Sequence, residues 1–241
     1  MRPGGEGGGG DGARARARTR AHDPPTHTPL PSGWLHGASG SRPPRRSPAS
    51  RLRMALGVAR GMQAFEQAHP HPILHRDLKL SNVFVDAGGA ARVADAGLAR
   101  WLRPGDGASL TGETGSYVEM APEVTRHEVY GSRADVWSFG VCLVELLAAA
   151  RPYEDLRLTP AQVATEVAAG RLRPTIPPDA PPAVAALAGA CLEHEAGLRP
   201  PFSAIVPALA RALADLPPDA GTPATAGSGV LARFWSGGAP A

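Results

Sequence analysis

Four side chains suited to chemistry lie close together in the chain: Asp77, Lys79, Asn82 and Asp95. Lys79 is the only lysine among 25 Lys and Arg residues, and Asn82 is the only asparagine in 241 residues. A carboxylate can accept a proton, an ammonium group can offset negative charge, and carboxylate and amide oxygens bind hard cations. This stretch is therefore the first candidate for a functional site, with proton transfer and charge neutralisation near a bound cation as its chemistry.

Further motifs follow this stretch in a fixed order. Residues 75–82 read His-Arg-Asp-Leu-Lys-Leu-Ser-Asn, and Asp95 lies thirteen positions after Asn82. The later motifs are Asp95-Ala96-Gly97, Ala121-Pro122-Glu123, Asp135-Val136-Trp137-Ser138-Phe139-Gly140 and Arg199-Pro200. An isolated His-Arg-Asp would be weak support, but the whole series resembles the catalytic domain of eukaryotic protein kinases. The resemblance covers residues 51–214, which correspond to the larger, C-terminal lobe only.

The type of kinase is suggested by the residues around this series. Lys79, two places after Asp77, resembles the serine/threonine pattern. Residues 55–61 and 173–177 are most similar to the tyrosine-kinase-like group, including the Raf-like enzymes of plants and algae. The resemblance implies a protein serine/threonine kinase, which uses ATP and Mg²⁺ to phosphorylate a hydroxyl group of a protein substrate.

The resemblance also implies a role for each of the four clustered residues. Asp77 is expected to accept a hydrogen bond from the substrate hydroxyl as the catalytic base. Lys79 is expected to place its positive charge against the transferring phosphoryl group. Asn82 and Asp95 are expected to bind Mg²⁺, which bridges the phosphates of ATP.

Regulatory and scaffolding roles follow from the same resemblance. His75 is expected to pack within the loop, and Arg76 to bind a phosphate placed on the activation segment by an upstream kinase. The candidate acceptors, among which the sequence does not choose, are Ser109, Thr111 and Thr114. Ser116 replaces the usual threonine and keeps a hydroxyl able to bridge Asp77 and Lys79.

Three further residues are expected to hold the lobe together. Glu123 and Arg199 are expected to form a buried ion pair. Asp135 is expected to hold the backbone of the catalytic loop.

The elements that must position these residues are mainly helical, so the expected fold is mainly α with a short β-hairpin. Apolar residues at three- and four-residue steps predict a helix from residue 51 to about residue 68. Residues 83–85 and 91–94 are predicted strands joined by a turn. Helices are predicted at residues 135–149, 160–169, 182–193 and 203–214, and residues 96–122 are predicted to be loop-like.

Both ends of the chain differ from this central part. Residues 1–50 are rich in Gly, Pro and Arg and carry eight arginines against three acids, so we expect a disordered tail of net charge +5. The remaining residues carry −2 of the total +3. Residues 215–241 are expected to form a second flexible tail.

Composition limits the location of the chain. Its two cysteines indicate no disulfide scaffold. No apolar run is long enough to cross a membrane. A cytoplasmic location is the expectation, and the basic stretch 41–48 could instead be a nuclear address.

Several departures from the kinase pattern leave alternatives open. No N-terminal lobe is recognisable, and Lys79 cannot also be the strand lysine of that lobe. Ala96 replaces Phe or Leu, and Glu119 replaces an aromatic residue. We therefore weigh a truncated or fragmentary kinase domain against a catalytically inactive kinase-like interaction module. Nucleic-acid binding by the basic tail is the least favoured alternative.

Overall fold

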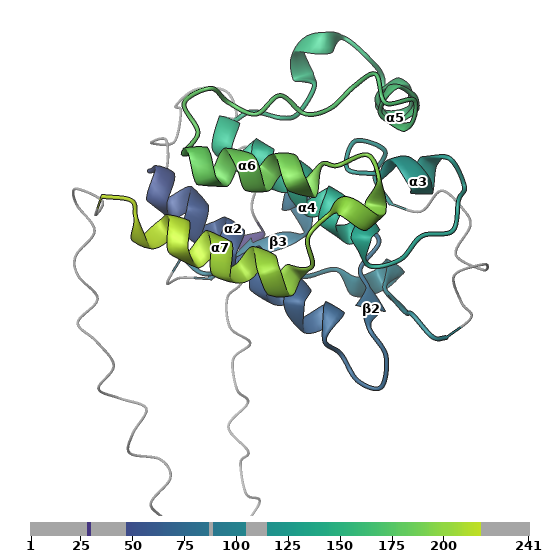
Figure 1. The fold of residues 1–241 in the computed structure, drawn as a ribbon, viewed down its shortest axis with the longest axis horizontal. Helices are drawn as coiled ribbons and strands as arrows, with labels where there is room; N and C mark the ends of the chain where they lie inside the picture. Colours follow the sequence, from purple (N-terminus) through teal and green to yellow (C-terminus); the bar gives the residue numbers. More distant parts are fainter. Residues whose placement is uncertain (1–27, 30–46, 87–88, 105–114, 218–241) are drawn as a thin grey trace, which may run out of the picture.

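Four helices, α2, α4, α6 and α7, pack side by side and enclose most of the core in a computed structural model of the chain (Figure 1). The structure describes residues 28–29, 47–86, 89–104 and 115–217. The strands are β1 (Thr28–Pro29), β2 (Ile73–Leu74), β3 (Val83–Val85), β4 (Ala91–Val93) and β5 (Arg100–Trp101). The α-helices are α2 (Pro48–Glu66), α3 (Pro122–Thr125), α4 (Arg133–Ala148), α5 (Pro160–Ala168), α6 (Pro182–Cys191) and α7 (Phe202–Ala214). Short 3₁₀ helices cover Leu80–Asn82, Ala96–Leu98, Glu154–Leu156 and Ala196–Leu198.

Helix α4 lies at the centre of the core. Twelve of its sixteen residues are buried, as its apolar sequence predicts. Phe139 of α4 meets Phe202 of α7 edge to face, with ring centroids 5.6 Å apart. Gly140 allows close approach of α6, because a Cβ at this position would lie 3.0 Å from the Cβ of Cys191. The packing of α4 therefore fixes the position of its first turn, which carries Asp135.

Helix α2 begins three residues earlier than the sequence predicted. Ser47 is its N-cap and accepts a hydrogen bond from the Ser50 amide at 3.1 Å, and Pro48 occupies the first turn. Both are ordinary signals of a helix start that the sequence analysis assigned to the linker. Buried residues such as Leu52, Ala59 and Met62 line the side of α2 that contacts its neighbours.

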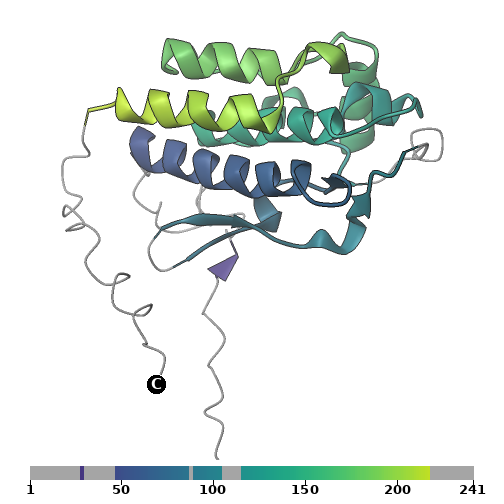
Figure 2. The ribbon, with the colours of Figure 1, turned by 60° about the horizontal axis from the view of Figure 1, so that its bottom comes forward.

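The predicted hairpin is confirmed as β3 and β4, which pair antiparallel with Val83 opposite Val93. Gly89 has a φ of +82° and closes the turn by donating to the Asp86 carbonyl at 2.8 Å. The hairpin packs closely on α2, because a Cβ on Gly57 would lie only 2.6 Å from the Ala91 carbonyl oxygen. Figure 2 shows the hairpin on one side of α2 and α7 on the other.

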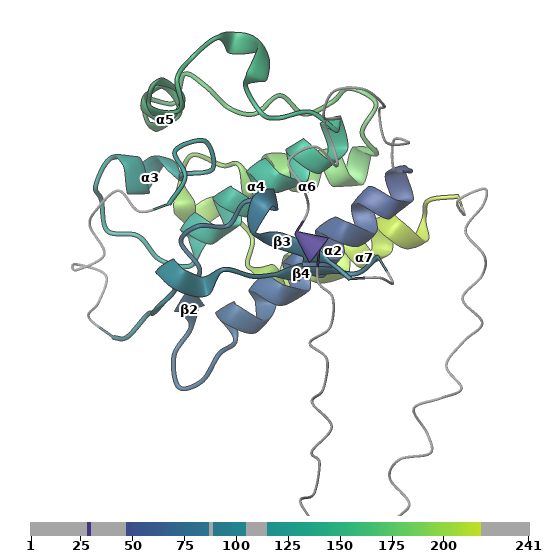
Figure 3. The same cartoon turned by 180° about the vertical axis from the view of Figure 1, so that it is seen from behind.

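Three short strands correct the sequence analysis. β1 pairs with β3 and lies in a segment where no strand was predicted, as Figure 3 shows from behind. β2 pairs with β5. β5 and the turn Ala96–Leu98 lie in the segment predicted to be a loop, and α3, which was not predicted, begins at the last residue of that segment. Two-residue strands are too short to show an alternating pattern, so only tertiary pairing reveals them.

The predicted tails are only partly covered by the described residues. Residues 1–27, 30–46 and 218–241 lie outside them, and the predictions for those ranges stay predictions. Within the part of the chain that the structure describes, no helix is both long and apolar enough to cross a membrane.

Candidate functional site

The loop formed by residues 75–82 is anchored to the first turn of α4. Asp135 accepts hydrogen bonds from the backbone amides of His75, at 2.8 Å, and Arg76, at 2.9 Å. Burial raises the pKa of Asp135, and the two amide hydrogen bonds act in the opposite direction. Arg76 has a φ of +65°, a conformation that such anchoring must maintain. Asp135 therefore fixes the path of the loop.

His75 is fully buried and packs as part of the loop. Its Nε2 atom lies 3.1 Å from the Ala94 carbonyl oxygen, and its ring lies 5.5 Å from that of Phe65. Its Nδ1 atom lies 3.4 Å from the Asp77 amide nitrogen, which donates to it. These contacts join α2, the end of the hairpin and the loop through one imidazole.

Asp77, Lys79 and Ser116 form one closed network. The Lys79 ammonium donates to Asp77 Oδ2 at 2.9 Å and to Ser116 Oγ at 2.8 Å. Ser116 Oγ donates to Asp77 Oδ1 at 3.0 Å. Ser116 lies 37 positions after Lys79 in the sequence, so only the folded chain brings the three together.

The Asp77 carboxyl is held in its charged form. Burial raises its pKa, but hydrogen bonds from Lys79 and Ser116, the Lys79 charge and a hydrogen bond from Asn82 outweigh this effect. The net pKa lies below the ordinary value for aspartate. A carboxylate in this state can accept a hydrogen bond from a hydroxyl group that approaches it.

Asn82 and Asp95 supply oxygen atoms of the kind that Mg²⁺ prefers. Asn82 donates through Nδ2 to the Asp77 carbonyl at 2.8 Å and to Asp77 Oδ2 at 3.1 Å. This orientation leaves Oδ1 without a hydrogen bond among the described residues. Asp95 is exposed, has a φ of +58°, and makes no ion pair within the described ranges. The two side chains therefore fit a magnesium site by the chemistry of their donors.

Arg76 makes a contact outside this network. Its Nε atom donates to the Leu98 carbonyl at 2.7 Å, next to the residues that follow Asp95. The three candidate phosphorylation sites, Ser109, Thr111 and Thr114, lie outside the described residues. The pairing of Arg76 with a phosphate stays a prediction.

Glu123 and Arg199 form a bidentate ion pair in the interior. Arg199 donates to the two carboxylate oxygens of Glu123 at 2.7 and 2.8 Å. It also donates to three backbone carbonyls, those of Glu193, Arg133 and His194. The pair joins the start of α3 to the loop before α7 and is almost completely buried.

The environment of Glu119 was not foreseen from the sequence. Glu119 is largely buried beside the Asp77 network, and burial together with the charge of Glu145 raises its pKa to about 7. The sequence singled out Glu119 only as a departure from the kinase pattern. No sequence signal gives its depth or its neighbours, which come from distant segments.

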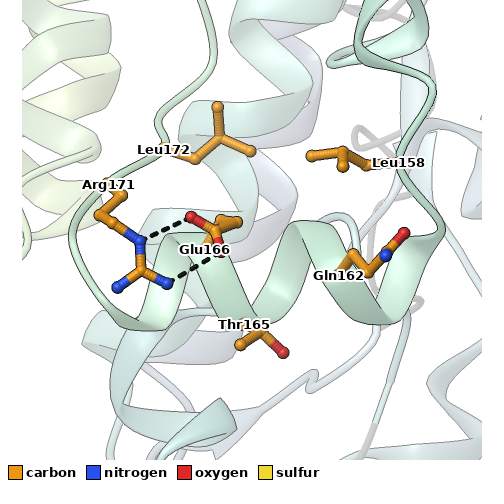
Figure 4. Close-up of a pocket in the computed structure, with 6 residues that line it drawn as sticks. All are labelled: Leu158, Gln162, Thr165, Glu166, Arg171 and Leu172. Carbon is orange, nitrogen blue, oxygen red and sulfur yellow. Dashed lines mark hydrogen bonds and ion pairs between the residues drawn. The ribbon is translucent and has the colours of Figure 1, made fainter.

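A surface pocket beside α5 was also not foreseen (Figure 4). Its volume is about 390 Å³, and its lining residues are Leu158, Gln162, Thr165, Glu166, Arg171 and Leu172. Arg171 forms a bidentate ion pair with Glu166 at 2.7 and 2.8 Å. None of these residues belongs to the loop that carries Asp77, and none lies in a recognisable motif.

Comparison with known proteins matches residues 31–209 to the family described as protein tyrosine and serine/threonine kinase. Among curated proteins, the chain is similar to three kinases of Arabidopsis thaliana. It is 41% identical over 155 residues to serine/threonine-protein kinase STY46, which is 64% of this chain and 26% of that protein. It is 40% identical over 156 residues to serine/threonine-protein kinase CTR1, which is 65% of this chain and 18% of that protein. It is 37% identical over 161 residues to serine/threonine/tyrosine-protein kinase HT1, which is 66% of this chain and 39% of that protein. The chain thus spans well under half the length of these relatives.

Proposed function

Because the chain belongs to the protein tyrosine and serine/threonine kinase family, we propose that its loop at residues 75–82 carries out phosphoryl transfer from ATP. The acceptor is a serine or threonine hydroxyl of a protein substrate. The network of Asp77, Lys79 and Ser116 is the observation that carries the proposal. It combines an ionised carboxylate, a positive charge and a hydroxyl group within hydrogen-bond distance of one another.

Asp77 acts as the base that orients the acceptor hydroxyl. Its low pKa keeps it ionised at neutral pH, so it accepts a hydrogen bond from the hydroxyl and then its proton. Ser116 donates to one carboxylate oxygen of Asp77 and Lys79 donates to the other, and the two hydrogen bonds together limit rotation of the Asp77 side chain. A fixed base lowers the entropic cost of aligning the hydroxyl for attack.

Lys79 supplies positive charge at the same point. Its side chain is 27% exposed, so a phosphoryl group can approach it without displacing the core. Negative charge that develops on the transferring group is offset there. An arginine would spread this charge over a planar group and would not pair with both Asp77 and Ser116 in the same way.

Mg²⁺ with ATP supplies the phosphoryl group and neutralises its charge when bound. Asn82 would bind the Mg²⁺ ion through Oδ1, and Asp95 would bind it through its exposed carboxylate. The Nδ2 hydrogen bonds of Asn82 turn its Oδ1 away from Asp77, which prepares it as a ligand. Arg76, in addition, would bind a phosphate on the activation segment after an upstream kinase has acted.

Phosphate transfer from labelled Mg-ATP to serine- and threonine-containing peptides tests this proposal. Asp77→Asn keeps the shape of the side chain but removes its basicity, so transfer should fall by about 100-fold or more. The matched control is Asp155→Asn, which changes an exposed acid remote in sequence and should leave the rate unchanged. Equal rates for the wild type and Asp77→Asn would refute the proposal.

A second candidate function is that of a non-catalytic kinase-like interaction module. Two observations favour it: the printed sequence contains a single lysine, already engaged with Asp77 and Ser116, and Ala96 presents only a methyl group after Asp95. Such a module would fold cooperatively but would not bind Mg-ATP. Calorimetric titration with Mg-ATP distinguishes the two, since heat of binding is expected only for the kinase.

A further inference from the structure

The carboxyl group of Glu119 has no partner that accounts for its burial. Within the part of the chain that the structure describes, no ion pair engages it, and the hydrogen bond that favours its ionised form comes only from its own backbone amide. It lines a small pocket together with Asp77, Ser116 and Ser138. An unpaired acid in such a place is costly when ionised.

The groups that face Glu119 are mostly acidic or unable to neutralise it. Helix α4 contributes Glu145 and Cys142, and the segment after α4 contributes Tyr153, whose hydroxyl is buried without a hydrogen bond. The loop at residues 75–82 contributes Asp77 and Lys79. Of these, only Lys79 carries a positive charge that favours ionised Glu119, and it is already paired with Asp77.

The backbone of Glu119 is coupled to the network. Its amide donates to the Ser116 carbonyl at 3.1 Å, which closes a turn over residues 116–119. Its carbonyl accepts from Ser138 Oγ at 2.8 Å, which ties the other end of the turn to α4. A displacement of Glu119 therefore moves Ser116, the residue that bridges Asp77 and Lys79.

We propose that Glu119 is a positioning residue: its neutral form holds the turn at residues 116–119 in place, and its ionised form loosens Ser116 from Asp77 and Lys79. Ionised Glu119 is repelled by the carboxylates of Glu145 and Asp77 and gains by moving toward water. The catalytic consequence rests on the proposed function, whereas the movement of the turn does not.

The pKa of Glu119, about 7, places this change within the physiological range. Asp77 stays ionised throughout, because its own pKa lies below the ordinary value. Raising the pH through neutrality should therefore slow phosphoryl transfer by altering the network rather than by titrating the base. The expected effect is on kcat, because Asn82 and Asp95 are not part of the turn.

Lys79 offers a direct reporter that needs no enzymatic activity. It is the only lysine, so selective ¹³C labelling gives one lysine ε-methylene signal in the NMR spectrum of the full chain. We expect this signal to shift with pH in the wild type, with a midpoint near 7. In Glu119→Gln the shift should disappear, because glutamine keeps the size of the side chain but does not ionise.

Two comparisons make the result unambiguous. Glu154→Gln changes an exposed acid and should keep the transition of the wild type. A flat Lys79 signal in the wild type, or a transition that persists in Glu119→Gln, would overturn the proposal. Persistence would assign the transition to another group near Asp77. A flat signal in the wild type overturns the proposal even if a variant fails to fold.

Phosphotransfer assays supply a separate test of the catalytic consequence. Between pH 6 and 8, kcat of the wild type should fall several-fold relative to that of Glu119→Gln, with KM for ATP unchanged. Parallel profiles for the two proteins would contradict the positioning role. No transfer by either protein, with the Lys79 transition intact, would instead count against the proposed function alone.

Discussion

Two carboxylate–cation pairs in this molecule differ in how completely they are satisfied. Arg199 and Glu123 are 0% and 6% exposed, and Arg199 uses five hydrogen bonds to fill its surroundings. Lys79 and Asp77 are 27% and 13% exposed. The Arg199–Glu123 pair is enclosed and leaves no room for another molecule, whereas the Lys79–Asp77 pair is accessible from solvent on one side. Similar charges thus provide a scaffold in one region and a candidate site for reactants in the other.

The comparison separates residues that resemble a kinase motif into two physical groups. Asp135, Glu123 and Arg199 are buried and fully bonded, so changing them should mainly alter stability. Asp77, Lys79 and Asp95 retain exposure or unused bonding capacity, so changing them should mainly alter binding and chemistry. Four experiments test this division, from the largest expected change in stability to the smallest.

Replacing Arg199 by Ala should have the largest effect. It leaves the Glu123 carboxylate buried without its partner and should lower the free energy of unfolding by about 3–5 kcal/mol. Urea denaturation measures the change. Arg171→Ala is the matched control, because its pair with Glu166 is exposed to solvent and should contribute little to stability. If Arg199→Ala lowers the free energy of unfolding by as little as the control does, the Arg199–Glu123 pair is not the scaffold that the comparison assumes.

Asp135→Ala should come next. It removes the acceptor of two backbone amides, and each unsatisfied buried donor costs about 1–3 kcal/mol. We expect a loss of about 2–4 kcal/mol and faster hydrogen exchange at the amides of His75 and Arg76. Ser132→Ala, at a neighbouring position whose side chain makes no capping bond, should change stability by less than about 0.5 kcal/mol. Unchanged exchange at both amides would show that Asp135 does not anchor the loop.

Glu119 lies between the buried scaffold and the open site, and the pH dependence of stability should show the effect of its burial. Its pKa is raised in the folded state from 4.5 to about 7, so its contribution is fully present below pH 4.5 and is lost as the pH rises through 7. Because Glu119 is largely but not fully buried, we expect Glu119→Gln to gain about 1–2 kcal/mol on the wild type between pH 5 and 8. Denaturation at these two pH values measures it, and parallel behaviour of the two proteins would argue against a buried acid.

Ser116→Ala should have the smallest effect on stability. Its hydroxyl joins partly exposed partners, so its loss should change the free energy of unfolding by at most about 1 kcal/mol. The pKa of Asp77 should rise toward its ordinary value, because the Ser116 hydrogen bond lowers it. A ¹³C carboxyl titration measures this shift, and Ser116→Thr, which keeps the hydroxyl, should not show it. An unaltered Asp77 titration in Ser116→Ala would exclude this bond as a determinant.

The sequence predicted those elements whose residue pattern along the chain is also the pattern that the folded core requires. The hairpin β3–β4 was predicted because its strands are long enough to show a pattern and Gly89 marks the turn. The order of the motifs gave the family, because each motif keeps its residues for a chemical reason. Helices α2, α4, α5, α6 and α7 were predicted within a few residues of their ends for the same kind of local reason, whereas the four-residue α3 was not predicted.

What the sequence could not give depends on distant pairing or on burial. β1, β2 and β5 have two residues each and exist only through their partners. The depth of Glu119 depends on Glu145 and Tyr153, which lie 26 and 34 positions further along the chain. The start of α2 was a missed local signal, since Ser47 and Pro48 mark it. The division between scaffold and open site therefore needs the folded structure.

Binding of a divalent cation with ATP tests the central claim most directly, because both candidate functions make opposite predictions for it. Selective ¹⁵N labelling gives one asparagine side-chain amide signal, that of Asn82, since the chain contains no other asparagine. With Mn²⁺ and ATP added, the account predicts that this signal broadens strongly, and that Asp95→Ala, but not Asp155→Ala, prevents the broadening. An Asn82 signal unchanged at saturating Mn²⁺ and ATP would contradict the account.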